Sequence, residues 1–150
     1  MYTIPKIILK NKNRIEEDFI ESWNLIEKFY QEYPDDSRPF TNDALRLIKE
    51  MRNCNLDKEL RAGQSLWFFL LSRNRWHGLD KEPHIRITFL GKNKMNIKSN
   101  FHGEEISKES EVNYSGYLKK MIDKLLEQEI ILNEYEDDDL DAFFASIDTD

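Results

Sequence analysis

The feature that most constrains the fold is a change in hydrophobic period partway along the chain. Between Asn13 and Pro34, large apolar residues recur every three or four positions, as on one face of a helix. From His84 to Phe101, apolar and polar residues alternate instead, around a Gly-Lys-Asn turn at 91–93. Helical and strand periods in separate blocks predict an α+β fold in which a helical N-terminal half packs on a small antiparallel sheet.

The N-terminal half is expected to hold three helices. The first has the apolar stripe Ile15, Phe19, Trp23, Ile26, Tyr30 and Tyr33, and the second, capped by Thr41, has the stripe Ala44, Leu47, Ile48 and Met51. The third is predicted over about 57–77, around the apolar run Leu66–Leu71. A buried strand is the alternative for that run alone, and the basic residues before Gly78 favour the helix.

The hairpin at 84–101 should direct its apolar residues, namely Ile85, Ile87, Phe89, Met95, Ile97 and Phe101, toward the helices. Two strands alone are marginally stable, so a third is expected from 112–114 or from the opening segment 2–9. A last helix is predicted from Ser115 to about Leu132, with the stripe Leu118, Met121, Ile122, Leu125, Leu126 and Glu129.

Chain length and composition fit one α+β domain over 1–133, followed by an acidic tail over 134–150. A chain of 150 residues can bury roughly 68–70% of its unfolded surface, so it needs no metal or disulfide to fold. The single cysteine, Cys54, is expected to be a packing residue. The N-terminus resembles no signal peptide and the longest apolar run has six residues, so a cytoplasmic location is expected.

Charge is segregated along the sequence. The net charge is −7 overall, with −2 over residues 1–40, +6 over 41–100 and −11 over 101–150. The tail contributes eight acidic residues and no basic one. A basic middle followed by an acidic end predicts that electrostatics matter to function.

The tail is a candidate binding element. After the acidic run Asp137, Asp138 and Asp139 come Leu140, Phe143, Phe144 and Ile147, at the spacing of one helical face. These apolar side chains need cover, either from the protein's own body or from a groove in a partner. A solvated, disordered tail is the remaining alternative.

A second candidate is an anion-binding surface. Arg86, Lys94 and Lys98 share the outward face of the predicted hairpin, and Arg73 and His77 lie one helical turn apart at the end of the predicted third helix. The alternative is that these residues keep a sheet surface soluble and stabilise a helix end. The aromatic residues of the hairpin alternate inward, which weakens a nucleic-acid interpretation.

The sequence carries no signature of catalysis, metal binding or cofactor binding. It lacks glycine-rich nucleotide motifs and nucleophile-elbow motifs, and its three histidines and one cysteine have no metal-ligand spacing. We therefore predict no catalytic residues, no metal and no cofactor. An enzyme whose site leaves no local motif stays an alternative, and it would need a polar pocket around Arg73, His77 and Arg86.

Two functional classes follow from the charge pattern. The first is a non-enzymatic binding protein, of the inhibitor, antitoxin or immunity type, that presents an acidic surface to a basic protein partner. The second is an anion or nucleic-acid binder that uses the central basic surface, with the acidic tail as an intramolecular competitor. Neither class involves a membrane, and the sequence leaves the oligomeric state open.

Overall fold

The computed structural model describes residues 6–32, 40–66, 68–74, 82–101 and 106–131. The architecture is α+β: two helices, a five-stranded antiparallel sheet and a C-terminal helix follow one another along the chain. The fold class predicted from the change of hydrophobic period is therefore confirmed. The tail at 134–150 and its predicted short helix lie outside the described residues.

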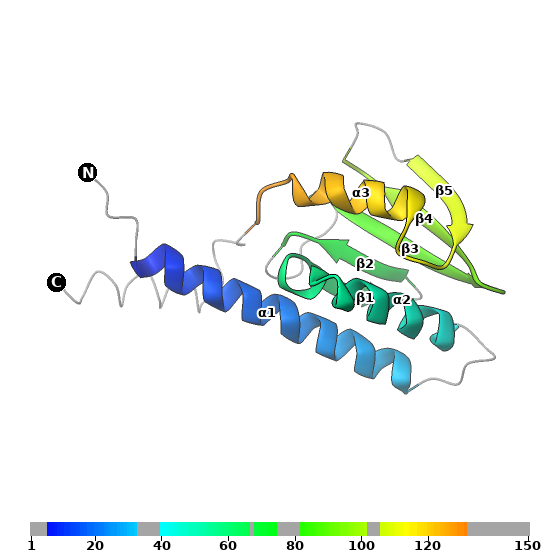
Figure 1. Ribbon diagram of the computed structural model, residues 1–150, viewed down its shortest axis with the longest axis horizontal. Coiled ribbons are helices and arrows are strands. Elements are labelled where there is room, and N and C mark those ends of the chain that lie inside the picture. The colour runs from blue at the N-terminus through cyan, green and yellow to red at the C-terminus, as the bar shows by residue number, and fades with distance from the viewer. Residues whose placement is uncertain (1–5, 33–39, 67, 75–81, 102–105, 132–150) are drawn as a thin grey trace.

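The sheet is a meander in which every strand pairs with its neighbours in sequence (Figure 1). Its strands are β1 (Arg61–Ser65), β2 (Phe68–Ser72), β3 (His84–Gly91), β4 (Lys94–Ser99) and β5 (Ile106–Glu111). All four pairings are antiparallel, so β1 and β5 form the two edges.

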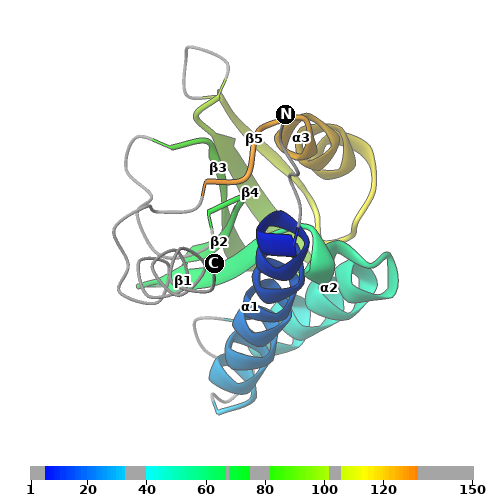
Figure 2. The same cartoon turned by 90° about the vertical axis from the view of Figure 1, so that its left-hand side faces the viewer.

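The helices are α1 (Lys6–Gln31), α2 (Thr41–Asn53) and α3 (Gly116–Leu126), with a short 3-10 helix, η1 (Leu56–Lys58), between α2 and β1. Figure 2 shows the three α-helices on the same side of the sheet. They enclose one hydrophobic core with the inward-facing residues of the strands.

The stripes predicted for the first two helices are buried. Those of α1 are Ile15, Phe19, Trp23, Ile26 and Tyr30, and those of α2 are Ala44, Leu47, Ile48 and Met51. Tyr33 lies outside the described residues. The cap predicted for α2 was wrong, because Thr41 is its first helical residue and Phe40, in a left-handed conformation, takes the N-cap position.

The opening segment was also misassigned in part, since residues 6–9 belong to α1 and not to a strand. The polar residues 10–12 that follow them, two lysines and an asparagine, continue the same helix and do not form a loop between two elements.

The predicted third helix over 57–77 was wrong. Its first part forms η1 and β1, and the apolar run crosses a turn into β2. At this turn Leu66 has a φ of 54° and is 76% exposed, whereas Phe69 and Leu71 are fully buried. A central strand covered on both faces has the same continuous apolar sequence as a buried helix, so periodicity did not separate the two.

The hairpin of β3 and β4 is confirmed, with Lys92 and Asn93 at its tip in left-handed conformations. The inward residues Ile85, Ile87, Phe89, Met95 and Ile97 are buried, and Phe101 packs against the core from its edge. The additional strands were misplaced, because β2 and β5 flank the hairpin and residues 112–114 follow β5 as a bend.

The last helix is shorter than predicted. Ser115 stands at its N-cap, and Leu118, Met121, Ile122 and Leu125 are buried. Glu129 lies beyond the end of the helix, because the chain bends back toward the sheet after Glu127. No helix among the described residues is long and apolar enough to cross a membrane.

Candidate functional site

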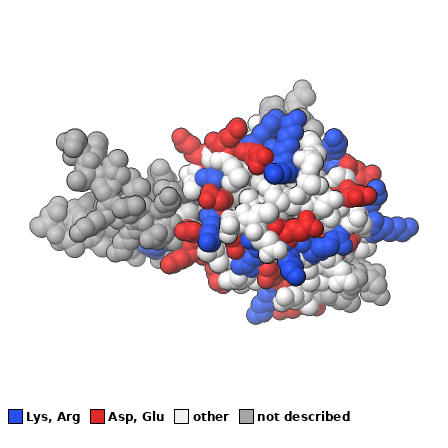
Figure 3. Space-filling model, viewed as in Figure 1, with Lys and Arg blue, Asp and Glu red and all other residues white. Residues whose placement is uncertain are grey.

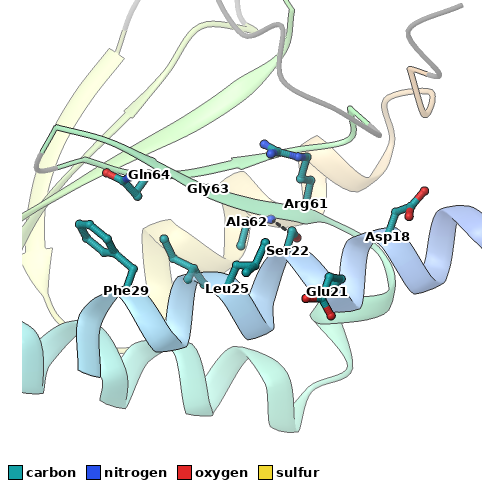
Figure 4. Close-up of a pocket in the computed structure, with 10 residues that line it drawn as sticks. Asp18, Glu21, Ser22, Leu25, Phe29, Arg61, Ala62, Gly63 and Gln64 are labelled. Atoms are coloured by element: carbon teal, nitrogen blue, oxygen red, sulfur yellow. Dashed lines mark hydrogen bonds between the residues drawn. The ribbon is translucent and has the colours of Figure 1, made fainter. Parts of the chain in front are cut away.

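A groove separates α1 from the edge strand β1, with a volume of about 430 Å³ (Figure 4). Its helix wall includes Asp18, Glu21, Leu25 and Phe29, and its strand wall is formed by residues 61–64. The groove therefore joins two segments about 40 positions apart in the sequence.

Hydrogen bonds hold the strand wall firmly against the helix. The buried Ser22 hydroxyl accepts a hydrogen bond from the Ala62 backbone N–H at 2.9 Å and donates one to the Phe19 carbonyl at 2.6 Å. One helical position away, the Trp23 indole N–H donates to the Leu60 carbonyl at 2.8 Å. The width of the groove is thus fixed by buried polar contacts, which are costly to break.

The groove offers both an apolar surface and a strand edge. Leu25 is 60% exposed there, and Phe29 is half-buried beside it. Backbone groups along a strand point alternately to either side, so the Gln64 peptide groups face the same side as the Ala62 N–H, away from β2. At Gly63, between them, an added Cβ would lie 3.2 Å from the Arg61 guanidinium. An exposed leucine beside a strand edge is a typical protein-binding surface.

Acidic side chains dominate the helix that forms this groove. Residues 14–32 contain six acidic and two basic residues, and Glu17 and Glu21 are exposed. Across the groove, burial lowers the pKa of the Arg61 guanidinium. Figure 4 shows Asp18 and Glu21 on α1, toward the same end of the groove as Arg61.

The outer face of the sheet, defined here as the side opposite the three described helices, carries the predicted basic residues of the hairpin. The strand register places Arg86 directly opposite Lys98 on the neighbouring strand, and opposite Leu70 on the other side. Two like charges in directly opposed positions destabilise a sheet unless something neutralises them. Lys94, at the tip, is opposite Glu111.

Arg86 is partly withdrawn from water on this face. Its guanidinium lies over the Phe68 ring, 4.7 Å from the ring centre, and its Nε is buried without a hydrogen-bond partner in the described structure. Leu70, beside it, is only 6% exposed, and Ser72 is 1% exposed. These exposed fractions are low for a face on which none of the described helices lies (Figure 2).

The other predicted anion-binding residues do not join this group through the described contacts. Arg73 lies beside Glu59, which it contacts at 3.8 Å through the carboxylate and at 3.4 Å through the backbone carbonyl. Burial lowers the pKa of the Arg73 guanidinium, and the nearby Glu59 charge opposes this effect. His77 lies outside the described residues, as do the seven tail residues predicted to bind a partner.

Many basic residues of the middle segment are neutralised locally. Arg46 pairs with Asp43 at 3.5 Å, and Arg52 pairs with Glu27 at 3.0 Å and with Asp57 at 3.1 Å. Figure 3 accordingly shows Lys and Arg interspersed with Asp and Glu over the face in view. The charge segregation of the sequence survives in space only in part.

Two further observations bear on chemistry. Among the residues described, no group of three or more His, Cys, Asp or Glu could hold a metal ion. Cys54 is exposed, so the expectation that it is a packing residue was wrong; it follows the end of α2, where its backbone N–H bonds helix carbonyls.

Sequence reasoning missed the groove. Leu25 was the available signal, because it is a large apolar residue outside the buried stripe of its helix. Gly63 and Gln64 gave no signal of the groove, because their segment was assigned to a helix.

Fold and surfaces together define an α+β domain with an acidic, leucine-containing groove on one edge of its sheet and paired cations on the outer face. The chain matches no protein-family model, no curated protein and no solved structure with which it was compared.

Proposed function

We propose that the protein is a non-enzymatic binding protein that presents the acidic side of α1 and the adjoining α1–β1 groove to a basic protein partner. The observation that carries this proposal is the exposure of Leu25 in a groove that Glu21 also lines. An apolar anchor surrounded by charge is the usual composition of a specific interface.

The apolar residues, the strand edge and the acids of this surface each have a different role in binding. Leu25 and Phe29 supply apolar contact area, and the strand edge offers peptide groups to an extended segment of the partner. The acids of α1 accelerate association with a positively charged surface and disfavour acidic competitors. Such an interface acts by covering its target and requires no reacting group of its own.

The test compares two charge-reversed proteins. One carries Glu17→Lys, on the exposed side of α1, with Glu21→Lys at the groove. The matched control carries Glu127→Lys with Glu129→Lys after α3, with the same change in net charge. Each protein, together with the unchanged chain, is immobilised and exposed to extract of the source cells. The affinity of retained proteins is then measured across a salt series.

The unchanged chain and the control are expected to retain the same basic protein, and the groove variant is expected to bind it about tenfold more weakly or worse. Leu25→Ser should weaken binding without changing its salt dependence, because it removes apolar contact and no charge. Equal retention by all variants, or retention of acidic proteins, would refute the proposal.

A second candidate function rests on the like-charge pair of Arg86 and Lys98. Two basic side chains on adjacent strands attract a phosphate or other anion, so the outer face suits an anion or a nucleic-acid backbone. Removal of 134–150 and measurement of single-stranded oligonucleotide binding across a salt series tests it. A gain in affinity with a steep salt dependence supports this function, and absence of binding in both forms rules it out.

A further inference from the structure

The two edges of the sheet differ in charge. Strand β5 carries exposed charged side chains along its length, at Lys108, Glu109 and Glu111. Charges of this kind discourage a further strand from pairing with an edge. Strand β1 has a charged residue at its start, Arg61, and three uncharged residues after it, 62–64. In the described sheet, β1 is therefore the edge that resists a further strand less.

Hydrogen bonding restricts strand pairing to the far end of β1. The Ala62 N–H points away from β2 and donates to the Ser22 hydroxyl, so a partner strand cannot use it. Strand alternation directs the N–H and C=O of Gln64 to the same side, one step beyond this contact. In an antiparallel pair, one residue opposite Gln64 exchanges both hydrogen bonds with it. The edge therefore suits a short extended segment and not a long added strand.

The residue opposite Gln64 has a defined environment. Gln64 is paired with Phe69, whose side chain is buried between the sheet and the helices, so side chains at this position point toward α1. Leu25, which is 60% exposed, and the half-buried Phe29 line the groove on that side. Figure 4 shows Phe29 and Gln64 toward one end of the groove. A β-branched apolar residue of the segment would bury part of Leu25 there.

Acids lie where the segment continues. After its apolar residue, an antiparallel segment runs toward the start of β1 and toward Glu21 on α1 (Figure 4). Glu21 is exposed and accepts a hydrogen bond from the neutral Asn24 amide at 3.3 Å, so this contact leaves its charge in place. Because Ser22 blocks pairing at this point, the segment leaves β1 and passes over α1.

The spacing of the acids sets the spacing of their basic partners. Glu17 is exposed one turn before Glu21, about 6 Å along the helix. Alternate residues of an extended segment are about 6.6 Å apart and point to the same side. Two basic residues at alternate positions of the segment therefore match the two acids, and opposite charge favours this alignment over the reverse one.

We infer that the groove binds an extended segment of the partner in which a β-branched apolar residue is followed, at alternate positions, by two basic residues. The apolar residue pairs with the Gln64 backbone in the antiparallel direction, and its side chain lies on Leu25. The basic residues lie against Glu21 and Glu17. This inference rests on the proposed function and adds the sequence pattern and the direction of the segment that the groove recognises.

The test is NMR titration of the full, isotope-labelled chain with short synthetic peptides at constant salt. The probe is a serine- and threonine-based peptide with isoleucine, lysine and lysine at alternate positions in that order. The matched control has the same residues in reverse order and therefore the same charge. The probe is expected to shift the amide resonances of Leu25 and Gln64 and to bind at least about fivefold more tightly than the control.

Two changes remove the backbone hydrogen bonds one at a time. A probe methylated on its isoleucine nitrogen cannot donate to the Gln64 carbonyl, and Gln64→Pro removes the Gln64 N–H, which faces away from β2. Each change is expected to weaken binding about fivefold. Gln64→Ala keeps the N–H and should bind within about twofold of the unchanged chain. The methylated probe leaves the protein intact, so the test stands even if the proline variant fails to fold.

Equal binding of the two peptide orders, binding of neither, or undiminished binding of the methylated probe would overturn this inference. Binding that weakens as the protein concentration rises would also overturn it, because a second copy would then occupy the groove. The proposed function has its own readout, the loss of a basic partner by the Glu17 and Glu21 variant. If that loss is seen while the peptides fail, the function stands and the partner docks through a folded surface.

Discussion

Replacement of Tyr30 by Phe tests whether the core contains a buried hydroxyl without a partner. The Tyr30 side chain is fully buried between α1 and the sheet, with its ring 6.1 Å from that of Phe89 and 6.4 Å from that of Phe69. Its hydroxyl has no hydrogen-bond partner in the described structure. A buried hydroxyl in this position costs about 1–3 kcal/mol, and Tyr30→Phe keeps the ring contacts while removing that cost.

The substitution is expected to raise the free energy of unfolding by about 1 kcal/mol at neutral pH, allowing for some relaxation around the hydroxyl. Urea denaturation followed by tryptophan fluorescence measures this change, with an unchanged denaturant dependence as the check on two-state unfolding. A loss of 1 kcal/mol or more would refute the reasoning, because it would mean that the hydroxyl makes a stabilising hydrogen bond.

Alkaline pH provides an independent measurement on the same residue. Burial raises the pKa of Tyr30 well above its usual value of 10.0. As pH rises past 10 the unfolded chain loses this proton while the folded chain keeps it, so stability falls with increasing pH. At pH 11 the loss from this residue is about 1.4 kcal/mol, and Tyr30→Phe should abolish it. The advantage of the variant should therefore be larger at pH 11 than at pH 8, and a constant advantage would contradict the assignment.

Three further substitutions should destabilise the fold. Gly91→Ala should cost about 1–3 kcal/mol and lower the melting temperature, because φ is +85° and a Cβ would lie 2.8 Å from the Phe40 ring. Ser22→Ala should cost about 1–3 kcal/mol in urea denaturation, since it leaves the Ala62 N–H without its bond. Arg52→Ala should lower the free energy of unfolding by about 1 kcal/mol. A double-mutant cycle with Glu27 on α1 should assign much of that loss to their ion pair.

The first two helices were predictable because their apolar residues occupy one face. Phe19, Trp23 and Tyr30 must share a side of any helix that contains them, whatever the rest of the fold does. The hairpin was predictable for the same reason at a period of two, with a turn composition that fixed its centre. In both cases the local pattern and the tertiary environment agree.

The first half of the sheet was not predictable on these grounds. Strands β1 and β2 are five residues each, and the apolar run begins at the exposed Leu66, in the turn between them. Whether such a run becomes a helix or a central strand depends on its pairing with β3, which no local pattern reports. Gly63, in a segment assigned to a helix, was the residue that argued against that assignment.

The candidate sites also depend on contacts between segments that are distant in the sequence. The α1–β1 groove exists because Ser22 bonds to β1 and Trp23 bonds to Leu60 just before it, contacts between segments about 40 positions apart. Sequence could place acids on α1 but could not place a strand edge beside them.

The basic residues of the middle segment, 41–100, lie on several different surfaces of the fold. Strand alternation and strand pairing, and not closeness in the sequence, decide which of them lie together. Basic residues on α2 and just after β2 pair with acids of their own or a neighbouring element. Arg86 and Lys98 occupy outward positions on adjacent strands, where the antiparallel register brings them directly together. Lys94, on the same face of β4, lies opposite Glu111. A segment that is basic in sequence therefore does not form one broad basic patch among the described residues, because strand pairing and helix packing place several of its cations next to acids.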